Sequence, residues 1–227
     1  EPSRLERAKR DVRAVLPELL GGDRIGLIAF AGEARLVVPL THDLESFGYL
    51  LDQVDTNTIR VGGSDLAEAI RQGLGLVADE QQSTSSILVL TDGEDLEGAG
   101  RQAAREAKDE GVVVHAVGYG SIRGSKIVLE KEGEASFLAD ASGDEVISAM
   151  DADGLRSMVE AAQGAFVRAD VVPLPLREIK RKRIDPMAKR SFDAGEEVLP
   201  QTRYQWVLLP GLLLVLLELW WSRGRRG

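Results

Sequence analysis

The stretch SSILVLTDGEDLEG, residues 85–98, joins an apolar run to an acidic turn. Residues 87–90 are continuously apolar, which is typical of a parallel strand buried on both faces. Asp92, Glu94 and Asp95 then place three carboxylates within four residues. In an open α/β sheet ligands bind beyond the carboxyl ends of the strands, and oxygen donors suit a hard cation such as Mg²⁺. The stretch predicts a binding site at Asp92, with a plain turn residue as the alternative.

Strand and helix patterns alternate on either side of this stretch. They predict a doubly wound, mostly parallel α/β sheet with helices on both faces, which ends near Asp170. We expect residues 121–150 to interrupt the alternation with a hairpin-like excursion that has short strands at 126–130 and 145–150. The apolar runs predict strands at 25–30, 36–40, 87–90, 112–117 and 166–167. Helical spacing predicts helices from Ser3 to Gly21, after Asp43, from Leu66, over 99–110 and around Leu155.

A second stretch, RVGGSDLAEAI at residues 60–70, points to the same edge of the sheet. Its glycine pair precedes a hydroxyl side chain and then a predicted helix. Ser64 stands at the start of that helix, where its oxygen can face the edge. The alternative is that Ser64 or Asp65 serves only as an N-cap, which needs no metal.

Composition removes several classes of function. The chain has 227 residues and a net charge of −9, which argues against a general nucleic-acid binder. It has no cysteine, so disulfides, thiolate zinc sites and cysteine nucleophiles are excluded. His42 and His115 are the only histidines, and neither belongs to a recognisable catalytic motif. We therefore expect no enzyme.

The C-terminal part of the chain differs in character from the rest. Residues 206–221, WVLLPGLLLVLLELWW, are nearly as long as the apolar run of about 20 residues that a membrane-spanning helix needs. The tryptophans at its ends and the arginines at 223–227 predict a transmembrane helix over 204–222 with a cytoplasmic tail. The domain before it is then extracytoplasmic; a buried core helix is the alternative. We expect residues 171–203 to form a linker and a basic segment, which either meets anionic lipid headgroups or is a solvated helix.

The motifs together resemble the von Willebrand factor A domain, and more narrowly the bacterial aerotolerance (Bat-type) membrane proteins. They are GDRIGLIAFAGEARLVVPLTHD, GGSDLAEAI, ILVLTDGED, VVHAVGYGS and the tail from DPMAKRSFD to RYQWVLLPGLLLVLLELWW. The resemblance implies a Rossmann-like vWA fold over residues 1–170. It also implies that Ser64 and Asp92 are ligands of a metal-ion-dependent adhesion site.

The first element of that site in the family, Asp-x-Ser-x-Ser, has no counterpart in these residues. The resemblance implies that this element and the first strand lie upstream of Glu1. The complete protein is then expected to bind Mg²⁺ (or Mn²⁺ or Ca²⁺), and this chain only weakly or not at all. Exposed strand edges are also expected.

The function implied by the resemblance is protein binding at an inner-membrane protein. An acidic residue of a partner would fill the open metal position, in the assembly or protection of a cell-envelope complex. Other von Willebrand A membrane proteins, an AAA-type ATPase system and the lipid bilayer are the implied partners, and nucleic acid is not among them. The alternatives are a metal-independent membrane scaffold and a metal-dependent hydrolase.

Overall fold

The computed structural model describes residues 3–19, 22–77, 84–93, 99–122, 124–126, 128–131, 134–137 and 147–188. All of them belong to one compact unit, Glu1–Ala188. The transmembrane helix predicted at 204–222 and the basic tail lie outside the described residues, as do Glu94 and Asp95. Within the described part of the chain, no helix has the length and apolar character needed to cross a bilayer.

The predicted alternation of helices and strands is confirmed. The main strands are β1 Ile25–Phe30, β2 Ala34–Thr41, β3 Ser86–Thr91, β4 Val113–Gly118 and β9 Phe166–Arg168. The α-helices are α1 Arg4–Val15, α2 Leu44–Gln53, α3 Leu66–Val77, α4 Gly100–Asp109, α5 Ala152–Ala161 and α6 Pro175–Ile179. Two short helical segments, η1 Leu16–Glu18 and η2 Lys180–Ile184, follow α1 and α6.

Helix α1 begins where it was predicted and ends earlier. Ser3 caps it, and the Ser3 Oγ accepts a hydrogen bond from the Glu6 amide at 3.1 Å. The helix was expected to reach Gly21. It ends at Val15, because Pro17 has no N–H to continue the α-helical bonding and lies in the 3₁₀ turn of η1.

The main strands form two groups. Strands β3, β4 and β9, in that order, make a parallel sheet. Strands β1 and β2 make an antiparallel pair, so the expectation of parallel strands holds only for the first group. The strand predicted at 36–40 is confirmed as β2, which runs through Pro39 and extends from Ala34 to Thr41. Among the described strands it pairs with β1 alone, and an edge strand tolerates a residue without an N–H.

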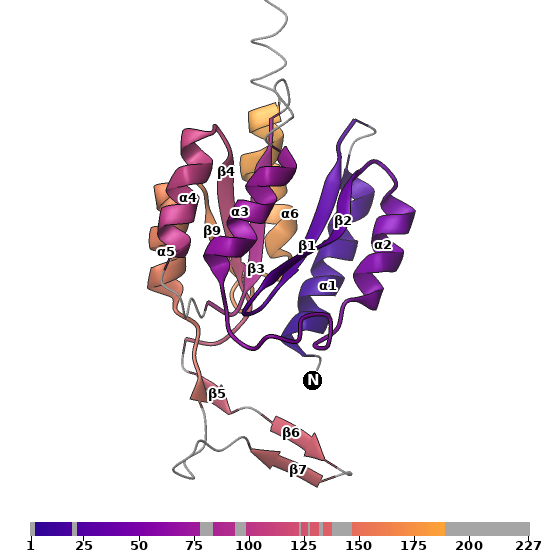
Figure 1. Cartoon of the computed structure of the whole chain (residues 1–227), viewed down its shortest axis with the longest axis vertical. Coiled ribbons are helices and arrows are strands. Elements are labelled where there is room, and N and C mark those ends of the chain that lie inside the picture. The colour runs from indigo at the N-terminus through magenta and orange to yellow at the C-terminus, as the bar shows by residue number, and fades with distance from the viewer. Residues whose placement is uncertain are drawn as a thin grey trace, which may run out of the picture. The chain divides into compact units, whose positions relative to one another are not determined.

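Helices cover both faces of the strands (Figure 1). One core cluster includes Ile70 of α3, Val114 of β4 and residues of α4 and α5. The other includes Phe47 of α2, Val117 of β4 and residues of α1 and α6. Val114 and Val117 are an odd number of positions apart, so they point to opposite faces of β4. Both are fully buried, which makes β4 the centre of the domain.

Strand β1 is less buried than its sequence predicts. All six of its residues are half-buried, although the run IGLIAF is as apolar as a central strand. Leu27 packs against one core cluster and Phe30 against the other, so both faces of β1 are covered. The exposure lies at its edge, because among the described strands β1 pairs only with β2.

Among its described residues, the excursion after β4 contains four short strands where two were predicted. β5 Ser125–Lys126 pairs antiparallel with β8 Ile147–Ser148, and β6 Val128–Lys131 pairs antiparallel with β7 Glu134–Phe137. The predicted strands at 126–130 and 145–150 fall in β5–β6 and β8. The hairpin itself is formed by β6 and β7.

The segment predicted as a linker after Asp170 contributes to the core. Leu176 and Ile179 of α6 are buried, with exposed fractions of 4% and 1%, in the cluster that contains Phe47. The compact unit accordingly extends to Ala188. The basic residues that follow Ile179 are partly held by ion pairs, as in Lys180 with Asp185 at 2.7 Å.

Candidate binding edge at the carboxyl ends of the strands

Asp92 follows β3 directly, at the carboxyl end of the strand where the sequence places it. The backbone on its N-terminal side is fixed, because the Thr91 carbonyl accepts a hydrogen bond from the Tyr119 amide at 2.7 Å. The buried Thr91 Oγ1 also accepts from the Gly93 amide at 3.1 Å. The Asp92 side chain is 36% exposed. A half-exposed carboxylate therefore stands on a rigid strand end.

Glycine is required directly after Asp92. Gly93 has a φ of 95°, which side-chain-bearing residues rarely adopt. A Cβ atom at this position would also lie 2.9 Å from the amide nitrogen of Asp151. Asp151 is the N-cap of α5, and its Oδ1 accepts from the Gly154 amide at 2.8 Å. The turn after Asp92 is thus packed against the start of α5.

The carboxylate of Asp92 is bound by Arg4. Arg4 Nη1 lies 3.0 Å from Asp92 Oδ2, and both side chains are 36% exposed. An ion pair with this exposure contributes about 0.2–1 kcal/mol. Arg4 was not among the site residues predicted from the sequence. Its signal was an arginine in the first turn of a helix, where the helix dipole disfavours a cation.

Ser64 lies in a loop that is fastened to the turn after β1. The Gly32 amide donates to the Val61 carbonyl at 3.1 Å, and the Asp65 amide donates to the Ala31 carbonyl at 2.7 Å. A Cβ on Gly32 would stand 2.3 Å from the Gly62 carbonyl oxygen, so the two backbones touch here. Ser64 itself is half-buried.

Of the two residues considered as a cap for α3, Asp65 has that role. Its Oδ1 accepts from the Glu68 amide at 2.9 Å, as an N-cap side chain does. Ser64 stands one position earlier, in the loop itself. The structure does not test whether Ser64 is a metal ligand, so that role stays a prediction.

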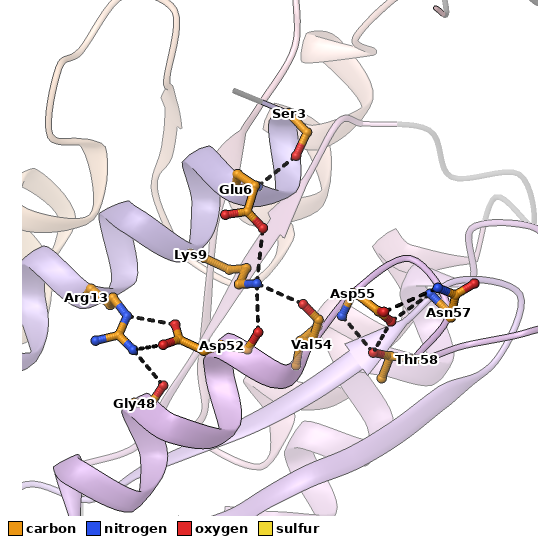
Figure 2. A network of polar contacts seen from close by, with 10 residues as sticks. All are labelled: Ser3, Glu6, Lys9, Arg13, Gly48, Asp52, Val54, Asp55, Asn57 and Thr58. Atoms are coloured by element: carbon orange, nitrogen blue, oxygen red, sulfur yellow. Dashed lines mark hydrogen bonds and ion pairs between the residues drawn. The ribbon is translucent and has the colours of Figure 1, made fainter. Parts of the chain in front are cut away.

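The start of the same loop is held by α1 (Figure 2). Lys9 Nζ donates to the carbonyl oxygens of Asp52 at 3.1 Å and Val54 at 2.9 Å, where α2 ends. Arg13 binds both carboxylate oxygens of Asp52. Beyond Val54, Asn57 and then Thr58 donate to the Asp55 carboxylate and hold the pKa of Asp55 below its usual range. The loop is therefore anchored at both ends.

The two predicted ligands belong to different strand groups. Ser64 is attached to the antiparallel pair, and Asp92 to the parallel sheet. Figure 1 shows the carboxyl ends of β1 and β3 and the start of α1 at the same end of the domain. The ion pair between Arg4 and Asp92 connects the start of α1 to the end of β3. This end of the domain therefore combines a helix start, a loop and a strand end.

The residues present do not fit a metal ion. Mg²⁺ prefers octahedral oxygen coordination, and Ser64 and Asp92 would supply two donors. One of these, the Asp92 carboxylate, is already paired with a guanidinium. The described residues contain no group of three or more histidine, aspartate or glutamate side chains that could hold a metal. The expectation of weak or absent binding in this chain stays a prediction.

Neither histidine stands at this edge. His42 follows β2, whose Thr41 pairs with Ile25 at the amino end of β1, opposite the carboxyl edge. His115 is 1% exposed inside β4, and its Nδ1 accepts from the Ala165 amide at 3.0 Å. Burial, with a smaller effect of Arg183, lowers the pKa of His115 to about 4. His115 is therefore packed inside the strand and hydrogen-bonded through Nδ1.

The chain is similar in sequence and fold to known proteins. The family model for the von Willebrand factor type A domain matches residues 1–94. The crystal structure of the conserved hypothetical protein BatB from Bacteroides thetaiotaomicron is 30% identical, with a TM-score of 0.77. The alignment covers 83% of this chain and 90% of BatB. The chain belongs to the von Willebrand factor type A family. The predicted resemblance is thereby confirmed.

Other relatives of this von Willebrand A domain include an aerotolerance-related membrane protein and a UPF0353 protein. An aerotolerance-related membrane protein from Bacteroides fragilis is 26% identical, with a TM-score of 0.71, over 80% of this chain and 90% of that one. A UPF0353 protein from Mycolicibacterium gilvum is 25% identical over 176 residues. The chain spans 52% of that protein and 26% of a Borreliella burgdorferi relative.

Proposed function

We propose that this von Willebrand A domain binds a partner protein at the edge that carries Asp92 and Ser64. The observation that supports it best is the half-exposed Asp92 carboxylate on a rigid strand end, where α/β sheets bind ligands. The loop with Ser64 is anchored at both ends. A surface that changes little on binding loses less conformational entropy than a mobile one.

The proposal includes a divalent cation only if oxygen ligands other than the described residues complete the site. In that case Ser64 and Asp92 would be two of the ligands of Mg²⁺, Mn²⁺ or Ca²⁺, and an acidic residue of the partner would be another. The described residues alone do not provide such a site.

We further propose that the domain is anchored to the inner membrane and faces the periplasm. The Bacteroides fragilis relative is an aerotolerance-related membrane protein, and the apolar segment at 206–221 has the composition of a span. A role in the assembly or protection of an envelope complex follows, with other von Willebrand A membrane proteins or an AAA-type ATPase system as candidate partners.

Binding rather than catalysis is proposed because the edge offers no histidine base. His42 lies at the other end of β1, and His115 is buried within β4. A general base must come within hydrogen-bond reach of the proton that it removes. The hydrolase alternative thus lacks this group.

The test is capture of the partner by the intact protein in its native membrane. Asp92→Asn removes the charge with little change in size, and we expect it to abolish co-purification of cross-linked partners identified by mass spectrometry. Glu106→Gln is the matched control, because Glu106 is a carboxylate of similar exposure, 38%, that pairs with Arg71. Equal capture by wild type and Asp92→Asn would overturn the proposal.

A metal-independent scaffold is the second candidate, and the Arg4–Asp92 ion pair favours it. If Arg4 stays paired with the Asp92 carboxylate, the edge needs no metal cation to neutralise it. Capture that persists in a chelator but is lost in Asp92→Asn would favour this candidate. Capture lost in both would favour the metal-dependent form.

A further inference from the structure

Exposed apolar side chains are concentrated at the end of the domain that carries Asp92. Within the described ranges six large apolar residues are exposed: Leu36, Tyr49, Val61, Ile122, Val171 and Leu174. Three of these lie in loops at the carboxyl ends of strands, Val61 beside β1, Ile122 after β4 and Val171 after β9. Exposed apolar residues are ordinary when they are scattered singly. Three of them in the loops of one edge indicate a surface for binding.

Val61 is held against the turn after β1. The Gly32 amide donates to the Val61 carbonyl at 3.1 Å. A Cβ atom on Gly32 would lie 2.8 Å from Val61 Cγ1, so the valine side chain rests on the glycine. Figure 1 shows this loop, which joins α2 to α3, at the end of the domain where α1 begins. One side of Val61 is therefore packed, and 48% of the residue remains exposed.

Ile122 stands on the turn that follows β4, next to Asp92. The Ser121 carbonyl accepts a hydrogen bond from the Met150 amide at 3.1 Å, which fixes the turn against the segment before α5. A Cβ atom on Gly120 would lie 3.9 Å from Asp92 Cβ, so the turn is within van der Waals range of Asp92. Ile122 itself is 49% exposed. The turn therefore places an apolar side chain two residues from its contact with Asp92.

Val171 stands on the turn that follows β9. The Arg168 carbonyl accepts a hydrogen bond from the Val171 amide at 3.3 Å, and Val171 is 66% exposed. Arg7 donates to the Ala169 carbonyl in the same turn. Because Arg7 lies about one helical turn after Arg4, α1 connects this turn to the ion pair at Asp92.

The end of β3 and the start of α5 form an acidic part of this edge. Asp92, Asp151 and Asp153 place three carboxylates there. Asp92 pairs with Arg4, and the 93% exposed Asp153 side chain pairs with Arg156. Three carboxylates against two guanidinium groups leave this part of the edge acidic. Arg4 and Arg156 therefore lower the negative charge without removing it.

This charge decides which kind of molecule fits the apolar side chains. The whole chain has a net charge of −9. Phosphate groups of nucleic acid or of anionic lipid would be repelled at the end of β3, and so would a carboxylate of a partner protein. A basic side chain would be attracted there, while the exposed cation Arg60 lies next to Val61 in the other loop. A protein partner with apolar and basic side chains is complementary to this arrangement.

We infer that the edge binds a protein segment whose contact side chains are apolar and basic, with Val61, Ile122 and Val171 as the apolar contacts. The inference rests on the proposed function, since it assigns the chemistry of the partner at the same edge. Removal of aliphatic side chains from water supplies the affinity. The hydrogen-bonded turns limit the entropy that is lost on binding. The basic side chain sets the orientation of the segment on the acidic part of the edge.

The test selects binding peptides from a phage-displayed library of random sequences, with the full 227-residue chain in mild detergent as the target. We expect the selected peptides to combine apolar residues with lysine or arginine. Their dissociation constants are then measured with synthetic peptides by fluorescence anisotropy. The triple variant Val61→Ser/Ile122→Ser/Val171→Ser should bind them about tenfold more weakly or worse, since apolar contacts at the centre of an interface contribute most of the affinity.

Leu36→Ser/Tyr49→Ser is the matched control, because it removes exposed apolar side chains from β2 and α2 instead. It should bind the peptides as wild type does. Val171→Ser alone, at the most exposed of the three positions, should weaken binding by about threefold and keeps the test valid if the triple variant does not fold. Circular dichroism of each variant checks the fold.

The inference is overturned if no peptide is enriched, if the enriched peptides are rich in aspartate and glutamate, or if their binding survives both Val171→Ser and the triple variant. An equal loss in the control would also overturn it. Failure here is distinct from failure of the proposed function. Partner capture that needs Asp92 but not the three apolar residues would keep the binding edge and remove the apolar contacts. Peptide binding that needs these residues, with capture unaffected by Asp92→Asn, would do the reverse.

Discussion

Strands β4 and β1 have similarly apolar sequences and different surroundings. In VVHAVG the last five residues are buried, whereas all six residues of IGLIAF are half-buried. β4 has a strand on each side, β3 and β9, while among the described strands β1 has only β2. An apolar run therefore predicts that a strand exists, but its neighbours determine how far it is buried.

The same difference separates the two halves of the candidate site. Asp92 follows β3 of the parallel sheet, in which β4 is the buried central strand. Ser64 lies in a loop that is hydrogen-bonded to the turn after β1, and among the described strands β1 pairs only with β2. Helix α3 packs against both β1 and β3, and α1 reaches Asp92 through Arg4. If the parallel sheet is the more tightly packed half, substitutions there should cost more unfolding free energy than matched substitutions at the antiparallel pair.

The largest effect is expected for Gly164→Ala. A Cβ there would lie 1.7 Å from the Val114 carbonyl oxygen of β4, which cannot move without displacing the strand. We expect a loss of about 3 kcal/mol in the free energy of unfolding, measured by urea denaturation.

Gly26→Ala is the matched change in β1. Its Cβ would stand 3.2 Å from the Val38 carbonyl oxygen, where a small shift suffices. We expect a loss below about 1 kcal/mol. Equal losses for the two glycines would refute the contrast between the strands.

Next in size is Tyr119→Phe. The Tyr119 hydroxyl donates to Asp11 Oδ2 at 2.7 Å, and the two residues are 3% and 8% exposed. Burial, and then the Asp11 contact, raise the pKa of Tyr119. Removal of the hydroxyl leaves the buried Asp11 carboxylate without this donor, at a cost of about 2 to 3 kcal/mol.

The Tyr119 prediction is checked by urea denaturation at neutral pH. Tyr49→Phe is the control, because Tyr49 on α2 is 67% exposed and should change stability little. A Tyr119→Phe variant as stable as the wild type would show that α1 is not held to β4 by this bond.

Acidification should destabilise the domain through His115. Its pKa is about 4 in the folded protein and near 6.5 when unfolded. The unfolded chain thus binds the proton first, and stability that is complete above pH 6.5 falls as the pH drops toward 4. We expect about 2 kcal/mol to be lost between pH 7 and pH 5.

His115→Gln provides the comparison for the acid effect, because glutamine does not titrate. The urea midpoint of this variant should depend less on pH between 7 and 5 than that of the wild type. Parallel pH curves for both proteins would contradict the role of His115.

The smallest loss of stability is expected for the helix caps, and it should be the same in both halves. Asp43 caps α2 beside the antiparallel pair, and Asp151 caps α5 beside the parallel sheet. Replacement of either by alanine should cost about 1 kcal/mol, because a cap bond is local. Thermal unfolding of the two variants checks this, and a cost confined to Asp151→Ala would extend the contrast to the helices.

Much of the fold is predictable because its signals are local. Apolar runs locate the strands within one or two residues, and Ser3 and Asp43 predict their caps correctly. The pairing of β1 with β2 as an isolated antiparallel pair depends on contacts between segments, which periodicity does not encode. Pro39 shows this limit, since its tolerance within β2 depends on the strand being an edge.

The candidate site divides in the same way. The place of Asp92 follows from the end of one apolar run, so the sequence predicts it. The Arg4 contact joins residues 88 positions apart and depends on the packing of α1. Only the disfavoured charge in the first helical turn hinted at it. Asp65 could be recognised as one of two possible caps, but the choice required the structure.

Partners are proposed to bind at the edge between Ser64 and Asp92. The most direct measurement is photo-crosslinking in the native cells, with a photoreactive amino acid at position 64 and, as control, at the exposed Glu45. Glu45 is in the first turn of α2, after β2, whose last residue pairs with the amino end of β1. We predict a discrete protein adduct from position 64 alone, lost in Asp92→Asn. The same adduct from position 45, or one from position 64 that survives Asp92→Asn, would contradict the claim.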